Sequence, residues 1–244
     1  MREKKRLDLL IADQNSHLSR NQIQSFILQR KVKVDDRIID KAGTIVAVDS
    51  RIEFDAQVPK YVSRGGFKLE AALNHFNIDV KNLVAMDAGI STGGFTDCLL
   101  QRGIKRVYGI DVGQSQVHER IKQDPRVTLF EKTNLRLLER LPEKVDLVTL
   151  DLSFISILKV MPAILNLIKP TACIITLIKP QFEAEREDIR RGGVVKDDSV
   201  HQRVIEKIKN GMSENGFKCA GIIDSPILGA TSGNKEFLGL FQKI

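Results

Sequence analysis

Four charged residues whose side chains could move protons or hold a polar substrate stand in short motifs far apart in the chain. Lys68 ends a Ser-Arg-Gly-Gly-Phe-Lys segment, and Asp151 lies within Leu-Asp-Leu-Ser-Phe. Lys179 begins Lys-Pro-Gln-Phe-Glu, and Glu236 ends Gly-Asn-Lys-Glu. Lysine and carboxylate side chains can act as general bases and acids when a cleft holds them in place. Any one of them alone is usually a solvated lysine or a helix-capping acid, so the proposal depends on a fold that joins the four segments.

A glycine-rich loop, residues 87–97, reads Asp-Ala-Gly-Ile-Ser-Thr-Gly-Gly-Phe-Thr-Asp and follows an apolar strand-like run. Its glycines allow sharp turns and a close approach of the backbone to a ligand. Asp111 ends the next strand-like run, where an acid can accept hydrogen bonds from both hydroxyls of a ribose. Asn134 follows the third run. These positions predict a nucleoside site at successive strand ends.

Nicotinamide dinucleotides and S-adenosylmethionine (SAM) both use this arrangement, so the fold alone does not choose between them. The loop lacks the Gly-x-Gly-x-x-Gly phosphate cradle. Asp87 would repel a pyrophosphate but suits a cationic amino acid, and Asn134 is placed to meet an adenine edge. These features favour SAM and leave a nicotinamide oxidoreductase as the runner-up. The predicted cofactor-binding residues are Asp87, Gly89, Ser91, Thr92, Gly93, Gly94, Phe95, Asp111 and Asn134.

Apolar runs alternate with helical patterns from a stripe at residues 69–76 to the C-terminus. The predicted strands are residues 83–88, 107–112, 127–131, 145–150, 172–178, 218–223 and 237–242. The predicted helices are residues 95–101, 115–122, 157–168 and 199–212. This alternation predicts an α/β domain, residues 61–244, with a doubly wound and mostly parallel sheet. Asp151 and Lys179 would then project from neighbouring strand ends into the same cleft.

The first sixty residues form a separate predicted module that carries 12 Lys and Arg against 9 Asp and Glu. A short helix at residues 7–12 precedes a second one at residues 20–30, for which Ser19 is a plausible cap. Short strands are predicted at residues 32–34, 37–39, 45–46 and 51–54, with a tight turn at residues 35–36 and a linker at residues 55–62. We therefore expect a small α+β domain at residues 1–60.

This module resembles the small RNA-binding domain first known from ribosomal protein S-four. The match rests on Leu-Asp-Leu-Leu at residue 7, Leu-Ser-Arg-Asn-Gln-Ile-Gln at residue 18, Val-Lys-Val at residue 32 and Asp-Ser-Arg-Ile-Glu at residue 49. By that resemblance, basic and amide side chains would bind phosphates and position the protein on RNA without reading bases. The implied RNA-binding residues are Arg20, Gln22, Arg30, Lys31 and Lys33, together with Arg64 in the second domain.

The whole chain resembles the TlyA family, which carries the historical label haemolysin and is similar to RNA ribose methyltransferases. Its most specific stretches are residues 63–69, 87–97 and 178–183. The second domain resembles the FtsJ/RrmJ class of Rossmann-like, SAM-dependent methyltransferases, whose Lys-Asp-Lys-Glu tetrad falls on Lys68, Asp151, Lys179 and Glu236. The loop Gly-Ile-Ser-Thr-Gly-Gly departs from the Gly-x-x-Pro-Gly-Gly of the stand-alone enzymes. The resemblance implies methyl transfer from SAM to a ribose 2'-hydroxyl, of cytidine, in ribosomal RNA.

The residue types suit this chemistry. A ribose hydroxyl is a poor nucleophile, and a partly desolvated lysine can deprotonate or orient it. We assign that activation to Lys179 and expect Asp151 to hold Lys179 in place. Lys68 and Glu236 would orient the ribose and the first lysine. No metal is required, because the sulfonium leaves as a neutral thioether, and positioning should supply much of the rate.

The composition narrows the class of protein. The chain has 244 residues, of which 42% are hydrophobic and 28% charged, and a formal net charge of +7. The positive surplus suggests a polyanionic partner, and ribosomal RNA or ribosomal subunits are the expected ones. Three widely spaced cysteines give no disulfide framework or zinc spacing, so we expect a reducing, cytoplasmic compartment. The most apolar stretch, residues 172–178, is too short to cross a bilayer, and no membrane partner is expected.

Three other classes of protein remain as alternatives. A non-catalytic RNA-binding or ribosome-assembly factor would keep the cleft without turnover, and the intact charged set argues against it. A membrane-lytic toxin would need an apolar span or a strongly amphipathic basic helix. A pseudouridine synthase can carry the same N-terminal module but needs a catalytic Asp in a β-rich domain, which the α/β pattern does not match.

Overall fold

The computed structural model describes residues 3–15, 18, 20–28, 30–54, 59–190, 192–229 and 233–244. The proposed cap Ser19 lies outside these residues, and so does the side chain of Gln22. The chain divides into two compact units, Met1–Lys60 and Tyr61–Ile244. Each unit has its own hydrophobic core, so each can be understood from its own sequence.

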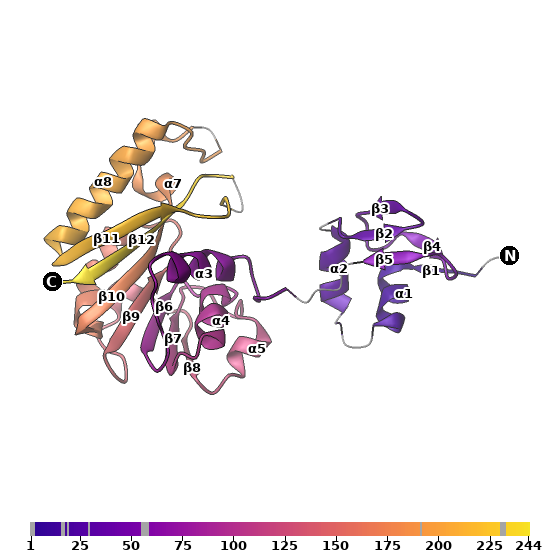
Figure 1. The fold of residues 1–244 in the computed structure, drawn as a ribbon, viewed down its shortest axis with the longest axis horizontal. Helices are drawn as coiled ribbons and strands as arrows, with labels where there is room; N and C mark the ends of the chain where they lie inside the picture. Colours follow the sequence, from indigo (N-terminus) through magenta and orange to yellow (C-terminus); the bar gives the residue numbers. More distant parts are fainter. Residues whose placement is uncertain are drawn as a thin grey trace. The chain divides into compact units, whose positions relative to one another are not determined.

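The described residues of the first unit form two helices and two small sheets (Figure 1). The helices are α1 (Leu7–Gln14) and α2 (Arg20–Leu28). One sheet pairs β1 (Lys4–Arg6) with β4 (Ile45–Ala47), and the other has β2 (Val32–Val34) between β3 (Arg37–Ile39) and β5 (Ile52–Phe54). Buried apolar residues of both helices, including Leu10, Ile11, Ile23 and Ile27, pack into one core. The predicted bounds of β2 and β3 are confirmed.

The described part of the second unit contains a seven-stranded sheet with the order β11-β12-β10-β9-β6-β7-β8. Its strands are β6 (Val84–Ala88), β7 (Arg106–Ile110), β8 (Val127–Phe130), β9 (Val145–Leu150), β10 (Ile168–Ile178), β11 (Phe217–Asp224) and β12 (Phe237–Lys243). Strand β12 is antiparallel to both of its neighbours, whereas β6 to β10 are mutually parallel. The predicted mostly parallel sheet is confirmed.

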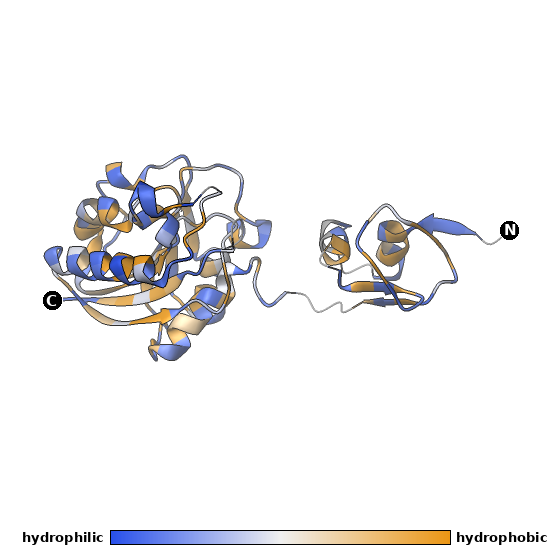
Figure 2. Cartoon of the chain, turned by 90° about the horizontal axis from the view of Figure 1, so that it is seen from above, coloured by the Kyte–Doolittle hydropathy of each residue, from blue (hydrophilic) through white to orange (hydrophobic). Residues whose placement is uncertain are grey.

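Helices cover both faces of this sheet because successive strand residues point to opposite sides. On one face, Ala85 and Leu147 share a core with residues of α3 (Gly65–His75) and α4 (Gly94–Gln101). On the other face, Met86 and Val148 share a core with residues of α6 (Met161–Leu167) and α8 (Asp198–Glu214). In Figure 2 the strands of this sheet are largely hydrophobic, while the helices mix hydrophobic and hydrophilic residues. The predicted doubly wound, Rossmann-like fold is confirmed.

Two predicted helices are shorter or more irregular than expected. The helix predicted at residues 115–122 is only α5 (Glu119–Lys122), because Ser115 has a left-handed backbone (φ 59°) and His118 caps the later start. The helix predicted at residues 157–168 begins as the 3-10 turn η2 (Ile157–Val160) before α6. The remaining short turns are η1 (Leu135–Leu137), α7 (Pro180–Glu183) and η3 (Arg186–Asp188).

The strand register brings the functional loops level with one another. Ala88 pairs with Ile110 on one side and with Leu150 on the other, so the residues that follow β6, β7 and β9 leave the sheet side by side. The chain runs from β6 outward to β8 and returns to β9 on the other side of β6, which makes this edge a topological switch point. Within the described ranges, no helix combines the length and the apolar character needed to cross a membrane.

Candidate active site

A cavity of about 490 Å³ lies at this edge of the sheet, where ligands bind in open α/β folds. It is bordered by the glycine loop, by the start of α3 and by the segments that follow β9 and β10. Its described lining includes Ser63, Arg64, Gly65, Lys68, Gly89, Ile90, Ser91, Thr92, Gly94, Phe95, Asp151, Ser153, Phe154, Lys179, Gln181, Phe182, Gly192, Gly193, Gly229 and Glu236.

All four residues of the predicted catalytic set line this cavity, as two lysine–carboxylate pairs. Lys68, from α3, pairs with Glu236. Lys179 Nζ lies 2.6 Å from an oxygen of Asp151. Antiparallel pairing explains the arrival of Glu236, because β12 begins level with the end of β10, where Phe237 pairs with Ile178. The sheet therefore brings together four segments that are far apart in sequence.

The ammonium group of Lys179 is fixed on several sides. Besides its ion pair with Asp151, it donates a hydrogen bond to Ser153 Oγ at 3.1 Å. It also lies 5.9 Å from the centroid of the Phe182 ring, close enough for a cation–π contact. Only 12% of the Lys179 side chain is exposed. The nitrogen is therefore held at one place on the cavity wall and largely shielded from water.

Glu183, which was not among the predicted site residues, connects the segment that follows Lys179 with the segment that follows Asp151. Its buried carboxylate accepts a hydrogen bond from Ile157 N at 2.7 Å, and so joins α7 to the segment that follows Asp151. Lys207 of α8 donates to the Glu183 carbonyl at 2.6 Å. Burial raises the pKa of Glu183. The sequence could have indicated a role for Glu183, because it ends the motif Lys-Pro-Gln-Phe-Glu that begins with Lys179.

The glycine loop is packed so closely that two of its glycines cannot be replaced without movement. Gly89 has a left-handed backbone (φ 82°), and a Cβ there would lie 2.5 Å from the carbonyl oxygen of Asp151. A Cβ on Gly94 would lie 2.2 Å from Ser63 Oγ. The loop backbone therefore contacts both the Asp151 segment and the segment before α3. Along with Gly89 and Gly94, the predicted cofactor residues Ser91, Thr92 and Phe95 line the cavity.

Asp87, in contrast, lies beneath the loop and outside the described cavity lining. It is fully buried in β6, and its two oxygens accept hydrogen bonds from Thr96 Oγ1 at 2.6 Å and Thr149 Oγ1 at 2.8 Å. Burial raises the pKa of Asp87 to about 6. Its contacts join β6 to α4 and β9, which makes it a support for the loop. Gly93, the N-cap position of α4, also lies outside that lining.

Asp111 follows directly after β7, and Asn134 lies four residues after the end of β8. The Asp111 carboxylate accepts hydrogen bonds from Ser91 N at 2.8 Å and Gly113 N at 2.7 Å. Asn134 caps η1 through Arg136 N, and the preceding Thr133 N donates to the Asp111 carbonyl. Asp111 is thus fixed with respect to the loop, and neither Asp111 nor Asn134 belongs to the described cavity lining.

Two aromatic rings at the cavity were not predicted. Phe154 is 92% exposed and has a left-handed backbone (φ 64°), a conformation that a bulky residue rarely adopts. Its ring centroid lies 5.1 Å from that of Phe182. An exposed, strained aromatic side chain at a cavity is a feature that periodicity does not reveal, because a single Phe after a strand looks like a core residue.

The predicted RNA-binding residues fall into separate places. Arg30, Lys31 and Lys33 line a hollow of about 800 Å³ on the first unit. Arg20 instead contacts the buried carboxylate of Asp8. Arg64, in the second unit, lines the cavity described above. Among the described residues, no group of three or more His, Cys, Asp or Glu side chains is arranged to hold a metal ion.

Comparisons with known proteins agree with both units. Residues 61–243 match the model of the FtsJ-like methyltransferase family, and residues 5–52 match that of the S4 domain. The chain is 37% identical to the 16S/23S rRNA (cytidine-2'-O)-methyltransferase TlyA of Mycobacterium tuberculosis, over 97% of this chain and 89% of the relative. It is 39% identical to Hemolysin A of Brachyspira hyodysenteriae, over 97% and 99%. A solved structure of a hemolysin-like protein from Streptococcus thermophilus covers 100% of this chain and 90% of its own, with 35% identity and a TM-score of 0.77.

Proposed function

The chain belongs to the TlyA family of FtsJ-like methyltransferases, and on this premise we propose that it methylates a ribose 2'-hydroxyl of ribosomal RNA, with SAM as the methyl donor. The observation that carries the proposal is the cavity in which two lysine–carboxylate pairs face the glycine loop. Cytidine is the proposed nucleoside, because the relative from M. tuberculosis is named for it. A cytoplasmic location, where ribosomal RNA is available, belongs to the same proposal.

The residues at the loop fit SAM. The Asp111 carboxylate would accept hydrogen bonds from the ribose hydroxyls, and Asn134 would meet the adenine edge. The loop from Gly89 to Phe95 would hold the amino-acid part, because its tightly packed glycines leave the backbone as the ligand-facing surface. When bound, SAM supplies an electrophilic methyl group attached to a sulfonium.

Lys179 is the proposed base. In its neutral form, Nζ would take the proton of the ribose hydroxyl while the oxygen attacks the methyl carbon. SAM would leave as a neutral thioether, because the electron pair of its carbon–sulfur bond would stay on sulfur. Asp151, 2.6 Å from Nζ, then stabilises the ammonium group that has formed. Ser153 holds the same nitrogen in place, so the proton is received at a fixed point.

The second pair has a different proposed role. The side chains of Lys68 and Glu236 are 10% and 3% exposed, so water screens their charges little. Glu236 fixes Lys68, and the remaining donors of its ammonium group would hold ribose or phosphate oxygens of the target nucleotide. Phe154 offers an exposed ring on which a base could stack, as aromatic side chains often do for unpaired RNA bases.

The test is to incubate the protein with methyl-labelled SAM and with separated small and large ribosomal subunits, and then to map the labelled nucleotide. We expect label on the ribose of a cytidine in at least one subunit. The Lys179→Ala variant is the negative control, because it should keep the cavity but lose transfer. Binding of ribosomal RNA by the wild-type protein without any label transfer would support the non-catalytic alternative instead.

A further inference from the structure

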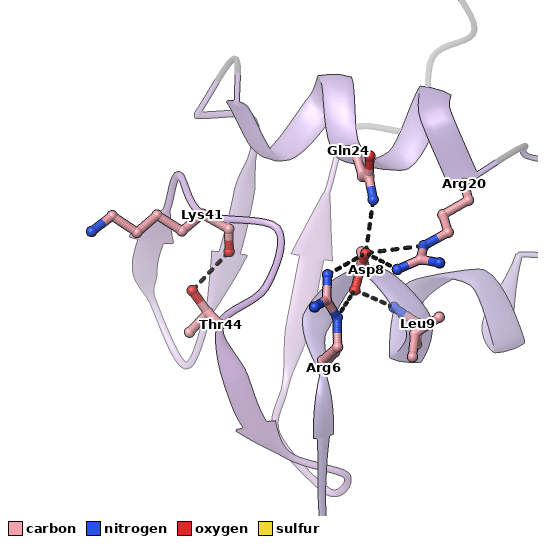
Figure 3. A network of polar contacts seen from close by, with 7 residues as sticks. All are labelled: Arg6, Asp8, Leu9, Arg20, Gln24, Lys41 and Thr44. Atoms are coloured by element: carbon pink, nitrogen blue, oxygen red, sulfur yellow. Dashed lines mark hydrogen bonds and ion pairs between the residues drawn. The ribbon is translucent and has the colours of Figure 1, made fainter.

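The first unit contains a buried carboxylate that carries an unusual number of hydrogen bonds. Asp8, in the first turn of α1, is fully buried, and Figure 3 shows side chains from two elements, β1 and α2, pointing at it. Arg6 of β1 donates through Nε and Nη2, at 3.0 and 3.1 Å. Arg20 of α2 donates through Nε and Nη2, at 3.1 and 3.0 Å, and Gln24 Nε2 adds a bond of 2.9 Å. One carboxylate thus sets the orientation of two guanidinium groups.

The two arginines can still bind another group while they contact Asp8. Their side chains are 44% and 52% exposed, although their partner is fully buried. Each guanidinium uses Nε and one terminal nitrogen on Asp8, so Nη1 takes no part in these bonds. The group carries two positive charges against one negative charge, because the hydrogen bond from Arg6 above all holds the pKa of Asp8 below its usual range. A fixed, partly exposed positive surplus remains.

This arrangement is better explained by phosphate binding than by stabilisation of the fold alone. A guanidinium presents its donors in a planar fork that matches phosphate oxygens, and it loses less entropy on binding when it is already held in place. A buried ion pair is, by contrast, weak evidence for stabilisation. The sequence analysis had singled out Arg20 by resemblance but neither Arg6 nor Asp8.

We propose that Asp8 is a positioning residue that presents Arg6 and Arg20 as a preformed pair of forks for a backbone phosphate of the RNA substrate. The inference rests on the proposed function, since it takes ribosomal RNA to be the ligand. Asp8 itself does not contact the RNA and would repel it. The negative charge of Asp8 alone would weaken RNA binding, whereas its positioning of the two arginines should strengthen it. The proposal can be tested because these two effects are opposite.

The decisive comparison is between Asp8→Asn and Asp13→Asn in the full chain. Both residues lie on α1, and both changes raise the net charge by one. Asp13 contacts Lys5 and is 56% exposed, so it positions neither arginine. Charge alone predicts that both variants bind RNA slightly more tightly. We expect instead that Asp8→Asn weakens binding to ribosomal RNA transcripts by about threefold to tenfold, which is the order expected when one or two side chains lose their preorganisation. Asp13→Asn should bind as tightly as wild type or more tightly.

Kinetics separate positioning from damage to the enzyme. In Asp8→Asn, KM for ribosomal subunits should rise while kcat and SAM affinity stay unchanged, because the reacting groups lie in the other unit. A second variant, Arg6→Lys with Arg20→Lys, keeps Asp8 and every charge but removes the forks. It should weaken binding to a similar extent, and adding Asp8→Asn to it should change little more. This variant decides the question if Asp8→Asn does not fold.

Two results would overturn the inference: RNA binding by Asp8→Asn as tight as that by Asp13→Asn, or wild-type affinity in the double lysine variant. Neither result would touch the proposed function, which fails separately if the wild-type protein neither binds nor methylates ribosomal RNA.

Discussion

At the scale of single residues, the chemistry depends on how firmly Lys179 is held. Its nitrogen contacts Asp151 and Ser153 and lies over the Phe182 ring, so its position is fixed by three different groups. A general base needs this placement, but it also needs a neutral form that can accept a proton. A residue that only supplied positive charge would need the placement alone. Substitution can separate these two roles.

We expect Lys179→Ala to keep SAM and RNA binding and to lose methyl transfer by roughly 10²–10⁴, the usual contribution of a positioned acid–base group. Lys179→Arg should also fail, because a guanidinium stays protonated and cannot act as a base. Single-turnover methylation of ribosomal subunits measures both variants. Lys169→Arg is the matched control, since Lys169 of β10 pairs with Asp146 of β9 and neither residue lines the cavity. Transfer by Lys179→Arg at nearly the wild-type rate would show that Lys179 is only a fixed charge.

A second residue-scale prediction concerns the cofactor. Asp111→Ala should weaken SAM binding by roughly tenfold to a hundredfold, which corresponds to the loss of a charged hydrogen-bonding group. The loop also loses the hydrogen bond from Ser91 N, so both effects act in the same direction. Calorimetry with SAM measures the change. Asp79→Asn, an exposed acid whose contact is a local turn, is the control. Unchanged affinity in a folded Asp111→Ala protein would remove Asp111 from the site.

At the scale of elements, Asp87 joins β6 to α4 and β9 with a carboxyl group that the fold prefers to keep protonated. Burial raises its pKa from 3.8 to about 6. Between these two values the folded state holds a proton that the unfolded state has released, so stability falls as pH rises from about 4 to 6. For the fully buried Asp87, this difference in pKa corresponds to a change of about 3 kcal/mol in the free energy of unfolding. Glu183, whose pKa burial also raises, acts in the same direction.

We therefore expect the second unit to be more stable at pH 5 than at pH 7. The acids of this unit whose pKa is lowered, Asp124, Asp146 and Asp197, act only below about pH 4 and do not oppose the trend in this window. Asp87→Asn should flatten the dependence, because an amide can bond to both threonine hydroxyls without titrating. Thermal unfolding at several pH values from about 4.5 to about 7.5 measures the dependence. An equally steep slope in Asp87→Asn would assign the effect to another group.

The sequence predicted the elements that depend on local patterns. Apolar runs located β6, β9 and β12 to within a residue or two, and their order implied that Asp151 and Lys179 share a sheet edge. What it missed depends on partners far away in the chain. Strand β1 is Lys-Lys-Arg, which has no strand pattern and exists through pairing with β4. The hydrogen bonds of Asp8 and Glu183 likewise come from other elements.

Asp87 shows the limit of strand-end reasoning within the site itself. The sequence placed it at the cofactor because it precedes a glycine loop, but burial depends on where the strand leaves the sheet. β6 continues through Ala88, so Asp87 remains between the two covered faces and is satisfied by threonines of α4 and β9. Asp111 comes one residue after β7 ends and meets the loop. A shift of one or two residues along the strand separates a buried supporting carboxylate from the carboxylate that is proposed to bind the ribose.

At the scale of the whole molecule, the chain has two units with different chemistry. The first sixty residues carry three of the seven surplus positive charges, and the fork pair at Asp8 and the basic hollow lie there. The second unit holds the described cavity with the two lysine–carboxylate pairs. Because each unit has its own core, removal of the first should not expose the interior of the second. Binding of RNA and binding of SAM should then be separable.

We expect a chain of residues 61–244 to bind SAM as tightly as the full protein but to bind ribosomal RNA more weakly. Each phosphate that the protein neutralises releases counterions, so the slope of log affinity against log salt should become shallower by about 0.7–0.9 for every phosphate that the shortened chain no longer reaches. If Arg6 and Arg20 of the first unit bind one backbone phosphate together, their loss alone should change the slope by about 0.7–0.9. Arg64 remains in the truncated chain and should keep a residual salt dependence.

Titration of both proteins against ribosomal RNA at several salt concentrations measures the slopes. Equal affinity and equal slopes would mean that the first unit has a task other than holding RNA, because a charge-driven interaction cannot be removed without changing its salt dependence.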